Sequence, residues 1–164
     1  HRAAAGESAS MGALLTNQGR LYTLLGHEDD AARALDEGVR LLQRFAGEDS
    51  LDAAQARLAR SDLAIQRGQL DAARDDLDAA RAVFEARLPE AHPLRARIVL
   101  SEADWAAQRG DSAAARAQFD RGIEALRAAG SAGASIDLGD ADNGLGVGWA
   151  VNVQVTDSPT SRVP

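Results

Sequence analysis

Small and large apolar residues form a stripe that returns every 42 residues along the chain. Gly26, Gly68 and Gly110 mark the same point in each copy. The stripe occupies the fifth, ninth, twelfth and sixteenth places after each glycine: Ala31, Leu35, Gly38 and Leu42; Ala73, Leu77, Ala80 and Phe84; and Ala115, Phe119, Gly122 and Leu126. This spacing places the four residues of a copy on one side of an α-helix. The pattern therefore predicts an amphipathic helix after each glycine.

A second helix is predicted before each glycine. The seventh residue before the glycine is small in every copy, as Gly19, Ser61 or Ala103. A small residue lets a neighbouring helix approach closely, and glycine ends a helix well because it turns left-handed without steric cost. Each copy is thus predicted to be helix, glycine turn, helix, and a fixed period of this size indicates a stack of such units.

The predicted helices follow from these patterns and from local capping signals. Asp49 or Ser50 is expected to cap the third helix and Asp111 or Ser112 the sixth, because short polar side chains satisfy free N–H groups there. Pro93 suits the first turn of the fifth helix. The predicted helices span about 11–25, 29–45, 51–67, 70–88, 93–109 and 112–130.

The two ends of the chain differ from the repeated part. Residues 1–10 are predicted to be the remnant of a preceding repeat, because A-G-E-S in this stretch echoes the link between the first two units. Residues 130–164 form a Gly-rich tail with no helical period. Within it, residues 149–155 alternate apolar and polar side chains, which predicts one short strand. We expect the tail to be disordered or loosely docked.

The repeated unit resembles the tetratricopeptide repeat (TPR) family. The resemblance lies in the small residue of the first helix, the turn glycine, the alanine five places later and the large–small pair beyond it. The period is longer than the family's usual length of about 34 residues and is similar to the variety found in kinesin light chains and bacterial regulators. The pair His92–Pro93 supports this, since H-P often opens such a repeat. The resemblance implies an all-α, right-handed superhelical solenoid of antiparallel helix pairs, with repeats at about 11–50, 51–91 and 92–129.

Composition and charge narrow the function classes. All 18 basic residues are arginine, which together with abundant alanine and aspartate suggests a GC-rich bacterial genome. The net charge of −7 opposes a nucleic-acid partner, which would need a basic face. No cysteine is present, and no run of 18 or more apolar residues could span a membrane. We predict a cytoplasmic protein, and because the chain opens on His rather than Met, we expect it to be a fragment of a longer one.

No arrangement of residues predicts catalysis, a metal site or a cofactor. Residues 27–30, H-E-D-D, could suggest a metal cluster, but acids are also favoured at a helix start by the helix dipole. Residues 140–144, D-A-D-N-G, match a calcium loop poorly. His92 is expected to cap a helix. The remaining charges are predicted to form i,i+4 pairs on solvated helix faces: Asp36–Arg40, Arg74–Asp78 and Arg116–Asp120.

The resemblance implies instead a non-enzymatic scaffold that binds a peptide or partner domain on its concave face. The side chains carried over to that face are Thr16, Arg20, Thr23, Gln55, Asp62, Gln66, Arg97, Asp104 and Gln108. The competing interpretation is that these are ordinary exposed residues. The alternative function is a regulatory or oligomerisation segment of a larger bacterial protein, such as a kinase or transcription regulator. Self-association through the exposed repeat ends or through residues 149–155 is a further option.

Overall fold

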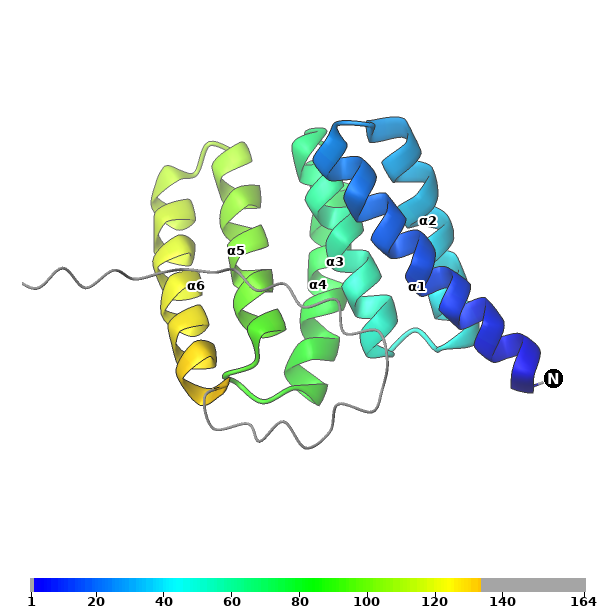
Figure 1. Cartoon of the computed structure of the whole chain (residues 1–164). Coiled ribbons are helices and arrows are strands. Elements are labelled where there is room, and N and C mark those ends of the chain that lie inside the picture. Colours follow the sequence, from blue (N-terminus) through cyan, green and yellow to red (C-terminus); the bar gives the residue numbers. More distant parts are fainter. Residues whose placement is uncertain (1, 134–164) are drawn as a thin grey trace, which may run out of the picture.

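The computed structural model describes residues 2–133, and this part of the chain is entirely helical (Figure 1). Its six helices are α1 (Arg2–Leu25), α2 (Glu28–Phe45), α3 (Leu51–Gln66), α4 (Leu70–Arg87), α5 (Pro93–Gln108) and α6 (Ser112–Gly133). The helices α2, α4 and α6 begin 42 residues apart, and so do α3 and α5. The sequence period is therefore also the period of the secondary structure.

The helix bounds agree with the prediction except at the two ends. Helix α1 begins at Arg2, so residues 2–10 continue into it instead of preceding it. This stretch carries no apolar stripe, but its alanines and arginine favour helix on their own. Helix α6 continues to Gly133. The predicted strand at 149–155 and the D-A-D-N-G segment lie outside the described residues.

The three repeated glycines close the helix hairpins as predicted. Their φ angles are 75° at Gly26, 70° at Gly68 and 84° at Gly110, which lie in the left-handed region that favours glycine. After Gly26, the His27 N–H donates to the Tyr22 carbonyl at 2.9 Å, and both other turns contain the equivalent bond. This is the Schellman arrangement, which satisfies carbonyls at a helix end.

Side chains cap three of the helices. Ser50, rather than Asp49, accepts a hydrogen bond from the Ala53 N–H at 3.1 Å. Asp111, rather than Ser112, accepts one from the Ala114 N–H at 3.0 Å. His92 accepts from the Leu94 N–H through Nδ1 at 3.1 Å, directly before Pro93, which opens α5. Burial lowers the pKa of His92, which favours the neutral ring that this hydrogen bond requires.

The core lies between successive hairpins. Each helix packs against the next one along the chain, and α3 also contacts α1 and α5. The predicted stripe is fully buried in α4, where Ala73, Leu77, Ala80 and Phe84 have no exposed surface. The small residues allow close approach: a Cβ added at Gly19 would lie 2.5 Å from Leu35 Cγ.

Ion pairs between helices correct one of the predicted local pairs. Asp36 does not bind Arg40; it accepts a hydrogen bond from Arg60 of α3 at 3.2 Å, and Arg40 donates to Glu37 at 2.7 Å. Arg60 also binds Asp76 of α4 through two bonds of 2.7 and 2.8 Å. A tertiary partner therefore replaces the local one, and Arg60 ties α2, α3 and α4 together.

Candidate functional site

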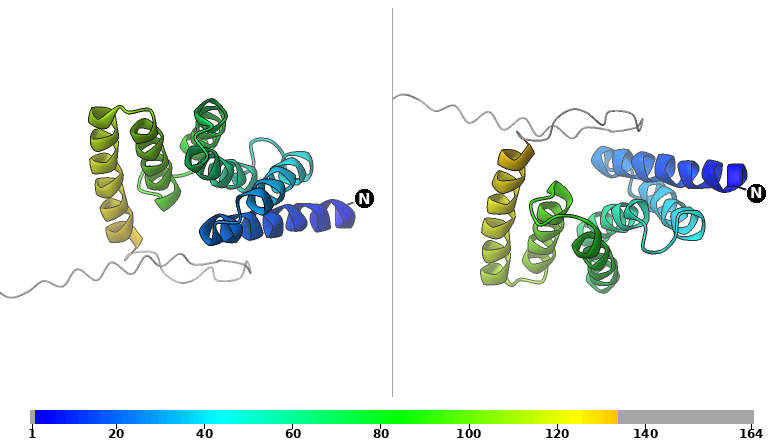
Figure 2. Two further views of the ribbon diagram at one scale, coloured as in Figure 1. Left: turned by 90° about the horizontal axis from the view of Figure 1, so that it is seen from above. Right: turned by 90° about the horizontal axis from the view of Figure 1, so that it is seen from below.

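A groove of about 600 Å³ opens along the side formed by α1, α3 and α5. The three hairpins follow one another along an arc, which brings these first helices of each pair together (Figure 2). The lining side chains are Arg20, Thr23 and Leu24 of α1; Ala59, Asp62, Ile65 and Gln66 of α3; and Arg97, Leu100, Ser101, Asp104, Ala107 and Gln108 of α5.

Most of the side chains predicted for a concave face line this groove. The seven are Arg20, Thr23, Asp62, Gln66, Arg97, Asp104 and Gln108. The structure places the other two elsewhere. Thr16 is buried against Gly38 of α2, and its hydroxyl donates to the Gly12 carbonyl at 2.9 Å. Gln55 lies in the first half of α3 and does not line the groove.

The sequence prediction missed the apolar and small residues of the groove. These are Leu24, Ala59, Ile65, Leu100, Ser101 and Ala107. The repeat itself could have identified most of them. Ala59 and Ser101 are 42 residues apart, and the same register relates Leu24 to Gln66 and Gln108. The groove is therefore lined by recurring positions of the unit, with different side chains in each copy.

Asp62 is the best-connected charge in the groove. Its carboxylate accepts a hydrogen bond from Arg97 at 2.8 Å and another from the Ser101 hydroxyl at 2.7 Å. Burial and the nearby positive charge of Arg97 lower the pKa of Arg20, and Asp62 partly offsets this. The two arginines and Asp62 thus form one coupled group shared by α1, α3 and α5.

Asp104 is in a different electrostatic position. Burial raises the pKa of its carboxyl group, and repulsion from Asp62 raises it further. No hydrogen bond or ion pair from residues 2–133 reaches this carboxylate. Asp104 is an exposed residue of the groove lining, so its carboxylate is open to pairing with a cation brought into the groove.

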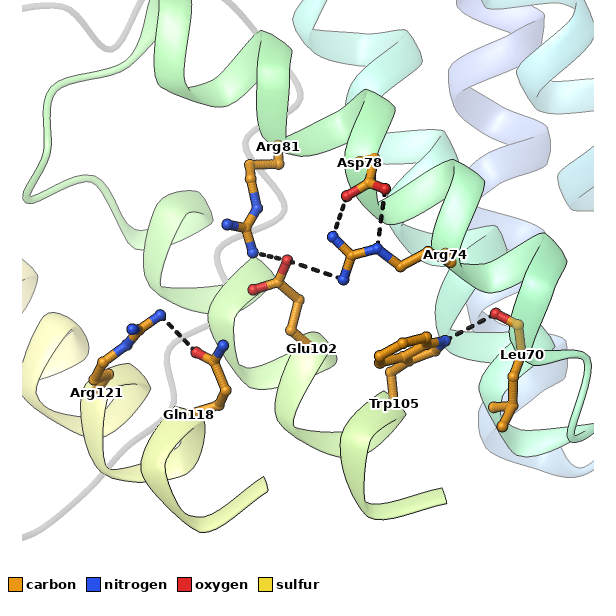
Figure 3. A network of polar contacts seen from close by, with 8 residues as sticks. All are labelled: Leu70, Arg74, Asp78, Arg81, Glu102, Trp105, Gln118 and Arg121. Atoms are coloured by element: carbon orange, nitrogen blue, oxygen red, sulfur yellow. Dashed lines mark hydrogen bonds and ion pairs between the residues drawn. The ribbon is translucent and has the colours of Figure 1, made fainter. Parts of the chain in front are cut away.

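A second, smaller hollow of about 230 Å³ lies between α4, α5 and α6. Figure 3 shows Arg74 and Arg81 of α4 pointing toward Glu102 of α5, which is only 3 % exposed. Glu102 forms ion pairs with Arg81 and, at 3.9 Å, with Arg74, which also binds Asp78 as predicted. The Trp105 indole N–H donates to the Leu70 carbonyl at 2.8 Å. These ion pairs join α4 to α5, so we assign this hollow to packing.

The H-E-D-D segment lies at the start of α2. Glu28, Asp29 and Asp30 occupy the first turn, and Arg67, the residue that follows α3, pairs with Glu28 at 3.5 Å and with Asp29 at 3.0 Å. Among residues 2–133, no group of three or more His, Cys, Asp or Glu side chains is placed to hold a metal ion.

Residues 2–133 thus form three successive helix hairpins with one groove along their first helices. No protein-family model matches the chain, and no curated protein matches it significantly. Within the described range, every helix is too short or too polar to cross a lipid bilayer.

Proposed function

We propose that the chain is a non-enzymatic scaffold of three TPR-like repeats that binds a peptide or a partner domain in the groove of α1, α3 and α5. The observation that carries the proposal is that recurring positions of three helices line one groove, with Arg20, Asp62, Arg97 and Asp104 in it. A surface that holds side chains of both signs over an apolar base suits a protein segment better than a small apolar ligand.

The chemistry of the groove favours an extended segment with a basic side chain. Asp104 supplies an exposed carboxylate for that side chain. Gln66 and Gln108, which occupy the same position in successive units, can donate to and accept from a peptide backbone. Leu24 and Leu100 offer apolar contact beside them. The repeat thus provides backbone recognition, and the variable charges provide selectivity.

Selection of random linear peptides displayed on phage, against the whole chain, tests this function. We expect the selected peptides to share Arg or Lys, and we expect Asp104→Asn to weaken their binding at least about tenfold, as for the loss of a charged hydrogen-bond partner. Asp75→Asn, an exposed aspartate on α4, is the matched control. Its binding should equal that of the unmodified chain. Peptides that bind both variants equally would place the binding surface elsewhere.

The pH dependence supplies a second readout of the same residue. The pKa of Asp104 is raised in the folded chain, so its effect on stability is most favourable below the unfolded pKa and is lost as the pH rises through the folded pKa. Asp104→Asn should therefore leave stability at neutral pH unchanged or slightly increased. Binding of a basic peptide should strengthen as the pH rises through the same pKa. A variant that loses binding through unfolding would contradict this assignment.

A further inference from the structure

The exposed large apolar side chains of residues 8–130 lie on only two helices, α1 and α6. On α1 they include Met11, Leu14 and Leu21, which are 50 %, 60 % and 53 % exposed. On α6 they are Ile123 and Leu126, at 43 % and 40 %. These are the first and last helices of the described array, so each lacks a neighbour on one side.

The repeat register relates the two exposed faces to a junction that is already present inside the array. Where α2 packs on α3, Val39 and Leu42 form a buried cluster with Ala53 and Ala56. Each of these four side chains is at most 1 % exposed. This junction joins the second helix of one unit to the first helix of the next.

The exposed residues of α6 are equivalent, by the 42-residue repeat, to the residues that α2 buries in that junction. Ile123 and Leu126 stand two periods after Val39 and Leu42, and both pairs have similar size and shape. Phe119 likewise corresponds to Leu35 of α2, which belongs to the buried cluster between α2 and α3. The side chains that would continue the array beyond α6 are therefore in place.

The exposed residues of α1 are equivalent, by the same repeat, to the residues that α3 buries against α2. Met11 and Leu14 stand one period before Ala53 and Ala56. Met11 and Leu14 are larger than those alanines. The α4–α5 junction nevertheless buries two large residues at one equivalent pair of positions. There, Phe84 corresponds to Leu126 and Ile98 corresponds to Leu14, and both are buried in one cluster.

We propose that copies of this chain associate end to end, with α6 of one copy packing on α1 of the next as α2 packs on α3. The two faces differ, so the contact is heterologous and propagates into open chains instead of closing as a two-fold dimer. The inference does not depend on the groove or on what the groove binds.

The contact is expected to be weak and apolar. Five half-exposed side chains bury only a few hundred Å², well below the roughly 800 Å² per partner of a stable interface. The internal junction also has the Asp36–Arg60 ion pair, whereas the positions in α6 and α1 hold Asp120 and Gln18. Because Gln18 takes the place of the arginine, the contact between α6 and α1 has no equivalent of this ion pair, so salt should change the association little.

Sedimentation equilibrium over a concentration series up to the millimolar range tests the proposal. We expect the weight-average mass of the whole chain to rise with concentration and to pass the dimer value without a plateau. A mass that stops at the dimer would overturn the heterologous contact. A monomer at every concentration would overturn self-association altogether.

Two variants with complementary faces sharpen the test. Leu14→Asp blocks the α1 face and Leu126→Asp blocks the α6 face, and both positions are exposed, so circular dichroism should show an intact fold. Each variant alone should remain monomeric, but an equimolar mixture should form dimers and nothing larger, because one free face of each kind remains. Ala82→Asp, at an exposed position of α4 that lies on neither end helix and does not line the groove, is the control and should associate like the unmodified chain. A mixture that stays monomeric, or a control that also loses association, would refute the pairing of faces.

Discussion

Leu77 of α4 is the residue whose truncation tests the packing most directly. It has no exposed surface and lies in the largest buried cluster, which joins α3, α4 and α5. Its neighbours in that cluster include Leu58 of α3, Phe84 of α4 and Ile98 of α5. The middle unit therefore depends on this side chain for contact with both sides of the array.

Leu77→Ala should lower the free energy of unfolding by about 3–5 kcal/mol, the upper part of the range for buried leucines. Two members of its own stripe, Ala73 and Ala80, are already small and fully buried, so they cannot extend to fill the cavity. A loss of this size is a large fraction of the roughly 5–15 kcal/mol that stabilises a typical domain. Because repeats stabilise one another through their interfaces, we also expect unfolding to become less cooperative.

Urea unfolding followed by circular dichroism and by Trp105 fluorescence measures both effects. Trp105 reports the α4–α5 junction through its bond to Leu70, and Trp149→Phe leaves it as the single tryptophan. The matched control is Leu24→Ala, since Leu24 is 70 % exposed and its truncation should change stability by less than about 0.5 kcal/mol. A loss below about 0.5 kcal/mol for Leu77→Ala, well under the expected range, would refute its place in the core.

Two further predictions concern the turn and the ion pairs. Gly68→Ala should lower the free energy of unfolding by about 1 kcal/mol, and only because φ at this residue is 70°, since an added Cβ meets nothing within 4 Å. Asn tolerates this conformation better than Ala, so Gly68→Asn should lower the melting temperature less. Equal losses for the two variants would contradict a backbone origin. Asp76→Asn should cost about 1–3 kcal/mol in urea melts, because it weakens a paired bond to Arg60 at a nearly buried site. The exposed Asp78→Asn should cost at most about 0.5 kcal/mol, and similar losses for both would show that burial does not strengthen the pair.

The six helices, their glycine turns and the buried stripes of α2 and α4 could be predicted from the sequence alone, whereas Leu126 of the corresponding stripe in α6 is 40 % exposed. These features depend on neighbouring residues: the glycines at 26, 68 and 110 adopt a backbone conformation that other residues avoid, and the Ala73–Phe84 stripe follows from the helical period. The resemblance, carried along the 42-residue register, placed nine side chains on a concave face, and seven of them line the groove.

Only the tertiary structure decided which polar side chains face the groove and which partners they choose. Thr16 lies on a predicted groove helix, but its side chain is buried beside Gly38 of α2. Asp36 is spaced for Arg40, yet Arg60 reaches it from α3. Local spacing fixes which groups can meet within one helix, whereas contacts between helices depend on how the axes pack. That packing is set by side chains far apart in the sequence, and a local pattern does not contain it.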